Sequence, residues 1–305
     1  MKVFYTDHFH IPLPANHRFP LEKYSLLRQR IIEDGFGGAV KLCVPRPASD
    51  EEILYAHSSS YLQRLQDGEM TPKEMRRIGF PWSAELVERA KRSAGATIEA
   101  CLRALDESFA MSLSGGTHHA FSDRGEGYCL LNDSVIAART LQHKNFVNKI
   151  LIIDCDVHQG NGTAAIVKND ASIFSFSIHG KNNFPYRKEK SDLDVDLEDG
   201  TDNLKYLEAL EKGLIRALEL SKAEFAIYLA GADPYADDRF GRLLLTKEGL
   251  LKRDRMVNHY CNKAGIPLAI TMAGGYARKI KDTVDIHFET VKAAVECQRQ
   301  APKPG

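Results

Sequence analysis

Short apolar runs alternate along the chain with longer segments in which apolar residues recur at helical spacing. Several of the short runs are apolar throughout, which is typical of strands covered on both faces in a parallel sheet. The pattern predicts strands at residues 2–5, 39–44, 109–113, 150–155, 173–178, 225–230 and 267–272.

The segments between these strands predict helices. Ser49 to Glu52 has the form of a capping box that opens a helix. Alternating strands and helices indicate an α/β fold, with a central, mainly parallel sheet and helices on both faces. Because no linker rich in Pro, Gly or Ser interrupts the pattern, we expect one domain over residues 1–305, with residues 301–305 as a frayed tail. The clearest amphipathic helix is at residues 203–220, and further helices are predicted at residues 83–105, 246–263 and 281–298.

Composition excludes several classes of protein. The 305 residues include 41 Lys and Arg against 41 Asp and Glu, so the formal net charge is zero. A neutral chain has no general attraction to nucleic acid or to an anionic membrane, and we expect neither as a partner. The sequence has no apolar stretch of membrane-spanning length and no signal-peptide core. Its six widely separated cysteines form no CxxC motif, which favours a reducing, cytoplasmic setting.

Groups that bind metals or transfer protons follow four of the predicted strands. In an open parallel sheet, ligands bind beyond the carboxyl ends of the strands, so we expect these segments to form a site. They are GGTHH (115–119), DCDVH (154–158), GADP (231–234) and AGGY (273–276).

The second of these segments has the spacing of a metal site. Side chains two residues apart in an extended chain point the same way, so Asp154, Asp156 and His158 share one direction. Two carboxylates and an imidazole suit Zn²⁺ or a similar divalent ion. Alone, the motif would fit a turn cap and a loop histidine better than a metal site. Asp233, at the end of another strand, shifts the interpretation to a metal site.

The paired histidines and a tyrosine are candidates for proton chemistry. An isolated pair would be a polar loop, but beside a metal His118 and His119 become a candidate general base and its electrostatic partner. Asp154 and Asn161 would orient their rings through the second nitrogen. Tyr276 follows two glycines that permit close approach to a cavity, where its hydroxyl would stabilise an oxyanion.

Together these motifs resemble the histone deacetylase family, which includes bacterial histone-deacetylase-like amidohydrolases and has the arginase/deacetylase fold. Two further segments, HRFPLEKY (17–24) and DLEDGTDNLKYL (196–207), are most similar to the class IV branch of that family. The resemblance covers nearly the whole chain. The motifs that carry it, in this order, are GGTHHA (115–120), GEGYCLLND (125–133), DCDVHQGNGT (154–163), FSIH (176–179), GADP (231–234) and GGY (274–276).

The resemblance implies a role for each matching residue. Zn²⁺, with Fe²⁺ as an alternative, would be held by Asp156, His158 and Asp233. His119 would be the general base and acid, with His118 as its electrostatic neighbour bonded to Asp154 and with Asn161 as the orienting partner of His119. Tyr276 would bind the substrate carbonyl, the carbonyl of Gly127 would accept the substrate amide N–H, and Tyr128 and Phe184 would form the tunnel walls. The resemblance also implies a structural K⁺ or Na⁺ site, formed by Asp154, Asp156, His158, Ser177 and the backbone of Ile178.

The resemblance also implies a metal-dependent amidohydrolase that acts on an acylated amine: an acyl-lysine peptide or protein, or an acyl-polyamine. Asn161 stands where some relatives have Asp, and residues 76–83 lack an acidic group that would bind a peptide backbone, which disfavours a protein substrate. The sequence gives no signal for an oligomeric state.

Two alternatives stay open. An arginase-like dinuclear ureohydrolase needs a DxHxD arrangement, whereas the order here is Asp-x-Asp-x-His. A non-catalytic scaffold that binds acyl-lysine or a partner protein would not need His118, His119 and Tyr276.

The acidic run at residues 192–199 lacks the glycine of an EF-hand loop, and we interpret it as a solvated strand.

Overall fold

The structure is a computed structural model that describes residues 1–9 and 11–300. Eight strands form one sheet in the order β2-β1-β3-β8-β7-β4-β5-β6, and all neighbouring pairs are parallel. The strands are β1 (Lys2–Phe4), β2 (Lys41–Cys43), β3 (Phe109–Ser112), β4 (Ile150–Asp154), β5 (Ile173–Gly180), β6 (Leu193–Leu197), β7 (Phe225–Ala230) and β8 (Leu268–Met272).

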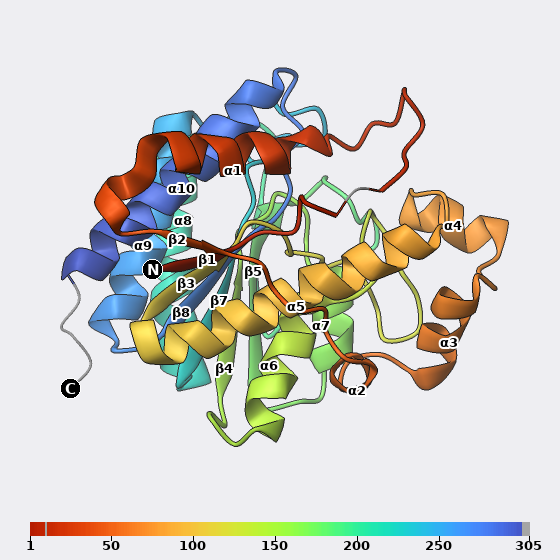
Figure 1. Cartoon of the computed structure of the whole chain (residues 1–305). Coiled ribbons are helices and arrows are strands. Elements are labelled where there is room, and N and C mark those ends of the chain that lie inside the picture. The colour runs from red at the N-terminus through yellow and green to blue at the C-terminus, as the bar shows by residue number, and fades with distance from the viewer. Residues whose placement is uncertain (10, 301–305) are drawn as a thin grey trace.

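Helices cover both faces of the sheet (Figure 1). One layer consists of α1 (Glu22–Asp34), α8 (Asn203–Ser221), α9 (Lys247–Lys263) and α10 (Ile280–Gln300). A short 3₁₀ turn, η1 (Gly35–Gly38), follows α1. The opposite side carries α2 (Asp50–Leu54), α3 (Ser59–Asp67), α4 (Pro72–Ile78), α5 (Ala84–Glu107), α6 (Asp133–His143) and α7 (Asn161–Val167).

The central strand β4 shows why the strands are apolar throughout. Leu151 and Ile153 pack into the core beneath the α1, α8, α9 and α10 layer. Ile150 and Ile152 pack into the core on the other face. All four are buried, and burying an aliphatic side chain contributes about 1.5–3 kcal/mol. Both faces of β4 therefore need apolar side chains, and the parallel α/β fold predicted from the sequence is confirmed.

Where an element was predicted, its difference from the structure is small and has a local cause. The strand predicted at residues 39–44 forms only as β2, an edge strand that pairs with β1 alone and is soon followed by Pro45. The acidic run at residues 192–199 forms the edge strand β6, as the solvated-strand interpretation predicts. The capping box is present, because the side chains of Ser49 and Glu52 each accept the other's backbone N–H. The predicted tail at residues 301–305 lies outside the described residues.

The sheet order places the predicted site. Strands β3, β8, β7 and β4 are consecutive neighbours, so the loops after their carboxyl ends meet at one edge of the sheet. None of the helices in residues 1–9 and 11–300 has the length and apolar composition that a membrane crossing needs.

Candidate active site

The four loops surround one cavity of about 630 Å³. Histidines, carboxylates and aromatic rings from sequence-distant segments meet there. Asp154 and Asn161 lie behind the histidines that they contact. The predicted residues that line the cavity are His118, His119, Gly127, Tyr128, Asp156, His158, Phe184, Asp233 and Tyr276.

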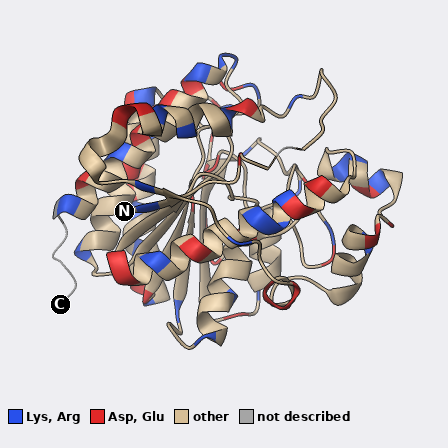
Figure 2. Ribbon diagram, viewed as in Figure 1, with Lys and Arg blue, Asp and Glu red and all other residues tan. Residues whose placement is uncertain are grey.

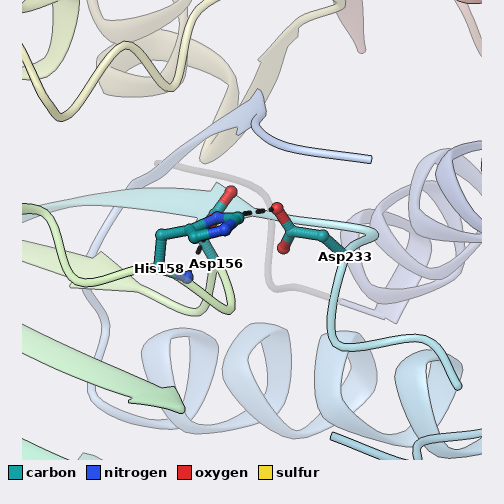
Figure 3. A group of neighbouring side chains, drawn as sticks. All are labelled: Asp156, His158 and Asp233. Carbon is teal, nitrogen blue, oxygen red and sulfur yellow. Dashed lines mark hydrogen bonds and ion pairs between the residues drawn. The ribbon is translucent and has the colours of Figure 1, made fainter. Parts of the chain in front are cut away.

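Three of these residues form a compact group of metal-ligand type. Asp156 and His158 follow β4 and Asp233 follows β7, and the carboxylate of Asp233 points toward the imidazole of His158 (Figure 3). Nδ1 of His158 lies 2.9 Å from Oδ1 of Asp156 and 3.3 Å from Oδ2 of Asp233. One ligand atom from each residue lies within 4.8 Å of the others, and all three residues are buried.

The donor set fits a divalent cation. Oδ2 of Asp233 is buried and accepts no hydrogen bond from the described residues, since its contact with His158 has ion-pair distance but not hydrogen-bond geometry. Burial and the charge of Asp156 raise the pKa of Asp233 to about 7. Burial opposes a charge on His158, but the hydrogen bond to Asp156 and the nearby Asp233 outweigh it and raise its pKa to about 10. A pair of carboxylates that attracts a proton this strongly would also attract Zn²⁺.

Gly274 lets the loop after β8 close over this group. Its N–H donates to Oδ2 of Asp156 at 2.7 Å. A Cβ atom at this position would overlap the carboxylates of Asp233 and Asp156. The second oxygen of Asp233 accepts the N–H of Val157 at 2.9 Å. Backbone donors from two different loops therefore hold both carboxylates.

The histidine pair has two different partners. Nδ1 of His118 lies 2.6 Å from Oδ2 of Asp154, and Nδ1 of His119 lies 2.7 Å from Oδ1 of Asn161. An amide oxygen only accepts, so Nδ1 of His119 carries the hydrogen and Nε2 of the neutral ring has the lone pair. Burial and the charges of His118 and His158 hold the pKa of His119 well below its usual value. Burial lowers the pKa of His118, but Asp154 and Asp156 outweigh it and raise that pKa to about 9.

Asp133 ends the GEGYCLLND motif, and its role was not predicted from the sequence: it holds the histidine loop in place. Its carboxylate accepts the backbone N–H groups of Gly116 at 3.1 Å and Thr117 at 2.7 Å, and the hydroxyl of Thr97 at 2.6 Å. Asp133 is completely buried at the start of α6. Its role depends on contacts with α5 and with the loop after β3, which no local motif predicts.

Tyr276 is positioned by the carboxylate of Asp238, a second residue whose role was not predicted from the sequence. Oδ2 of Asp238 accepts the N–H of Tyr276 at 2.6 Å, and its Oδ1 accepts the N–H of Phe240 at 2.8 Å. The rings of Phe240 and Tyr276 lie 5.0 Å apart. Burial, with the charges of Asp156 and Asp233, raises the pKa of Tyr276 well above its usual value. Its hydroxyl therefore stays protonated and remains a hydrogen-bond donor.

Gly127, Tyr128 and Phe184 form walls of the cavity. Gly127 has φ of 54°, and a Cβ there would lie 2.6 Å from Cδ2 of His119, so glycine is required. Tyr128 also has positive φ, 65°, and its N–H donates to the carbonyl of Ile78 at 2.6 Å. The ring of Phe184 lies edge-on to His119 at 4.9 Å. The predicted amide acceptor Gly127 and the predicted tunnel residue Phe184 therefore lie against His119, and the predicted tunnel residue Tyr128 lines the same cavity.

The residues of the predicted monovalent cation site are also close together. Asp154 and Ser177 are register partners on β4 and β5. Oδ1 of Asp154 accepts the N–H of Asp156 at 3.1 Å, and the hydroxyl of Ser177 lies 2.9 Å from Nδ1 of His179. The cation site itself, which also includes His158 and the backbone of Ile178, stays a prediction.

A buried arginine supports both loops of the metal-type group. Arg253 on α9 is fully buried and donates to the carbonyls of Cys155, at 3.3 Å, and Gly231. Its charge is balanced by Asp254, with Nη2 at 2.8 Å from Oδ1. The hydroxyl of Tyr228 donates to the same oxygen of Asp254. Cys155 precedes Asp156 and Gly231 lies two residues before Asp233, so Arg253 joins the two loops from beneath.

The parallel sheet and the residues at its carboxyl edge define a protein of the arginase/deacetylase fold. A family model described as the histone deacetylase domain matches residues 17–291. The chain therefore belongs to the histone deacetylase family. This confirms the resemblance at the level of the family; the class IV assignment stays a prediction.

Similar proteins agree with the family model. An uncharacterized protein of Picosynechococcus sp. is 41% identical over 96% of this chain and 97% of its own length. Histone deacetylase 2 of Arabidopsis thaliana is 28% identical over 88% of this chain and 73% of its own. The histone deacetylase-like amidohydrolase of Pseudomonas aeruginosa is 28% identical over 87% and 74% of the two chains.

A solved structure supports the fold. A histone deacetylase homolog from Aquifex aeolicus has a TM-score of 0.81 and 24% identity, and the match covers 96% of this chain and 83% of that one. Because its identity is below 25%, this likeness shows the fold alone.

Proposed function

We propose that the protein is a metal-dependent deacylase that hydrolyses the amide of an acylated amine, with acyl-lysine as the type of substrate. The observation that carries the proposal is the meeting of three kinds of group around one cavity: the Asp156, His158 and Asp233 group, the oriented pair His118 and His119, and Tyr276. Membership of the histone deacetylase family supports hydrolase chemistry.

Asp156, His158 and Asp233 would hold the metal, which when bound polarises a carbonyl and acidifies a water molecule. The lone pair on Nε2 of His119 accepts a proton from the attacking water as the new C–O bond forms. The hydroxyl of Tyr276 donates to the carbonyl oxygen as negative charge develops there. The C–N bond then breaks, and the proton on the histidine pair passes to the amine nitrogen. Water is the only co-reactant, and the products are an acid and an amine.

The substrate would enter along Tyr128 and Phe184. The carbonyl of Gly127 accepts the thiol of Cys129 at 3.3 Å and keeps a second lone pair for the substrate amide N–H. This acceptor would fix the amide in the orientation that presents its carbonyl to Tyr276. We also infer a reducing compartment, because all six cysteines are free thiols.

The structure weighs against the two alternatives. Within the described residues, Asp156, His158 and Asp233 are the one group of three that could hold a metal, which favours a mononuclear site over a ureohydrolase pair. A non-catalytic scaffold would gain nothing from the hydrogen bond that orients His119. Elemental analysis of metal per chain and a turnover assay separate the three functions.

The decisive experiment is a screen of acyl-lysine peptides and acyl-polyamines, from acetyl to myristoyl, with the protein loaded with Zn²⁺ or Fe²⁺. Release of the free acid is the expected result. If neither metal supports release from any substrate, the proposed function is wrong. The screen also identifies the preferred acyl group.

A further inference from the structure

The mouth of the cavity carries four arginines. Arg18, Arg77, Arg239 and Arg242 all line the cavity and are also exposed to solvent, so they lie at its opening. We call these four residues the arginine rim. Apart from the carboxylates of the metal-type group, Glu126 is the one acidic residue among the described residues that line the cavity. The rim is therefore positively charged, although the whole chain is neutral and both signs are mixed over the helices (Figure 2).

Three of the four charges are free to meet a ligand. Arg242 forms an ion pair with Asp199 at 3.1 Å. Within the described part of the chain, Arg18, Arg77 and Arg239 have no ion-pair partner. Among the described residues, the side chain of Arg239 donates a hydrogen bond to the carbonyl of Arg278 alone, at 3.4 Å. An exposed arginine with no internal partner keeps its donors available to a carboxylate or a phosphate.

The chain fixes Arg77 and Arg239 to the cavity wall, so they are not loosely tethered surface charges. The carbonyl of Arg77 accepts the N–H of Gly127 at 3.1 Å, which joins the end of α4 to the proposed amide acceptor. The N–H of Arg239 donates to the carbonyl of Tyr276 at 3.3 Å. Each backbone therefore bonds directly to a residue proposed to contact the substrate.

Arg18 is fixed by its neighbours. The rings of His17 and Phe19 pack against Tyr128, with ring centres 6.1 and 5.3 Å apart. Arg18 lies between them in the chain, and its charge acts to lower the pKa of Tyr128, which burial raises overall. Three segments that are distant in sequence, the loop before α1, the end of α4 and the loop after β7, thus bring a cation to the same opening.

We infer that the arginine rim selects acylated amines that carry carboxylate or phosphate groups next to the acylated position. This inference rests on the proposed deacylase function and narrows its substrate class. When an acyl-lysine side chain fills the tunnel, the flanking residues of its peptide lie at the rim. Acidic flanks then meet unpaired guanidinium groups, whereas lysine-rich flanks and the free amines of a polyamine meet charges of their own sign.

The test compares peptides that differ only in the flanks of one acyl-lysine: Glu, phosphoserine, Gln or Lys, together with an acyl-spermidine. We expect kcat/KM at low salt to be about tenfold higher for the Glu-flanked than for the Lys-flanked peptide, the size that two or three exposed ion pairs supply. The ratio should fall toward one at about 1 M salt. A preference for the phosphoserine peptide alone would assign the rim to phosphate.

Charge-matched variants show whether the arginine rim causes the preference for Glu-flanked peptides. In R18Q/R77Q/R239Q, the Glu-to-Lys ratio should fall to about twofold or less. The control R103Q/R216Q/R255Q removes the same charge from arginines whose side chains reach solvent but do not line the cavity, and it should keep the tenfold ratio. Because both peptides are measured on one preparation, any loss of folded protein cancels in the ratio.

The Gln-flanked peptide separates failure of this inference from failure of the proposed function. If that peptide is hydrolysed but the Glu and Lys peptides react equally at low salt, the rim inference is wrong and the deacylase stands. If no peptide is hydrolysed, fluorescence anisotropy with labelled acetyl-lysine peptides on the Tyr276→Phe protein decides the matter. Tighter binding of the Glu-flanked peptide supports the rim, and equal or absent binding of the two charged peptides overturns it.

Discussion

Asn161 accepts the Nδ1 hydrogen of His119 at 2.7 Å, in the position that the carboxylate of Asp154 occupies relative to His118. One histidine of the pair therefore has a charged partner and the other a neutral one. The carboxylate favours the imidazolium form of His118, whereas the amide orients His119 without adding a negative charge. The pair thus combines a ring that stays charged with a ring whose lone pair is free for a proton.

Removing this acceptor should disable His119 as the proposed general base. In Asn161→Leu the Nδ1 hydrogen loses its partner and the ring loses its preferred tautomer, so we expect kcat to fall about 10²-fold or more with KM little changed. Asn161→Asp keeps an acceptor in the same place and should retain more activity than the leucine variant. Steady-state kinetics of the two variants test the role; equal rates in both would contradict it.

Tyr276 distinguishes a catalyst from a scaffold. Tyr276→Phe removes the hydroxyl proposed to stabilise the oxyanion, and kcat should fall by about 10²–10³-fold while peptide affinity persists. Tyr55→Phe is a matched control, because its exposed hydroxyl bonds to Glu51 far from the cavity. Single-turnover rates and peptide binding are measured together. Unchanged turnover in the first variant would exclude this role for Tyr276.

Gly274 is expected to be essential for metal binding. In Gly274→Ala the added methyl overlaps the carboxylates of Asp156 and Asp233, so the group opens and zinc per chain should drop well below one. Gly265→Ala is the control, because a Cβ there has no atom within 4 Å and only its φ of 68° is strained. That control should lose about 1 kcal/mol of stability and no zinc. Equal zinc content in both proteins would refute the proposed ligand geometry.

Much of this site could be predicted from the sequence, because most of its polar residues lie in short motifs that follow the strands. Alternation places Asp154, Asp156 and His158 on one side of a chain segment, and the order of strands brings Asp233 to the same edge. Helix α1 was not predicted, because it begins after Leu21 without a side-chain cap. The strands of the sheet were easier to predict than this helix, because each buried strand is apolar on both faces.

The supporting residues could not be predicted in this way. Asp133, Asp238 and Arg253 act on backbone groups that are brought to them only by the fold, and Arg253 contacts a carbonyl 98 positions away in the chain. An aspartate or arginine is ordinarily a solvated residue, and only burial in the fold distinguishes these three. The arginine rim escaped prediction for the same reason, because its members come from three separate segments.

His57 should make stability depend on pH. It is buried, and its Nε2 accepts the N–H of Asn132 at 2.9 Å. Burial lowers its pKa from 6.5 to about 4. Above pH 6.5 the ring is neutral in both states; as pH falls from 6.5 to about 4, only the unfolded chain binds a proton, so stability is lost by up to about 3 kcal/mol. In His57→Gln the loss of stability between pH 6.5 and about 4, measured by urea unfolding, should be smaller. If the free energy of unfolding falls equally with pH in the wild type and the variant, the prediction is wrong.

Arg253 should control metal affinity from beneath the site. Arg253→Met leaves the buried Asp254 unpaired and should cost about 3–5 kcal/mol of stability. In Arg253 the Nε donates to Asp254 while Nη1 donates to the carbonyls of Cys155 and Gly231. Arg253→Lys keeps the charge but has a single nitrogen for these partners, so it should fold yet bind zinc about 10–100-fold more weakly. Arg255→Lys, on an exposed part of the same helix, should leave zinc affinity unchanged. Zinc titration against a chelating dye measures the zinc affinity of the two lysine variants. Wild-type affinity in the folded Arg253→Lys protein would limit Arg253 to a purely structural role.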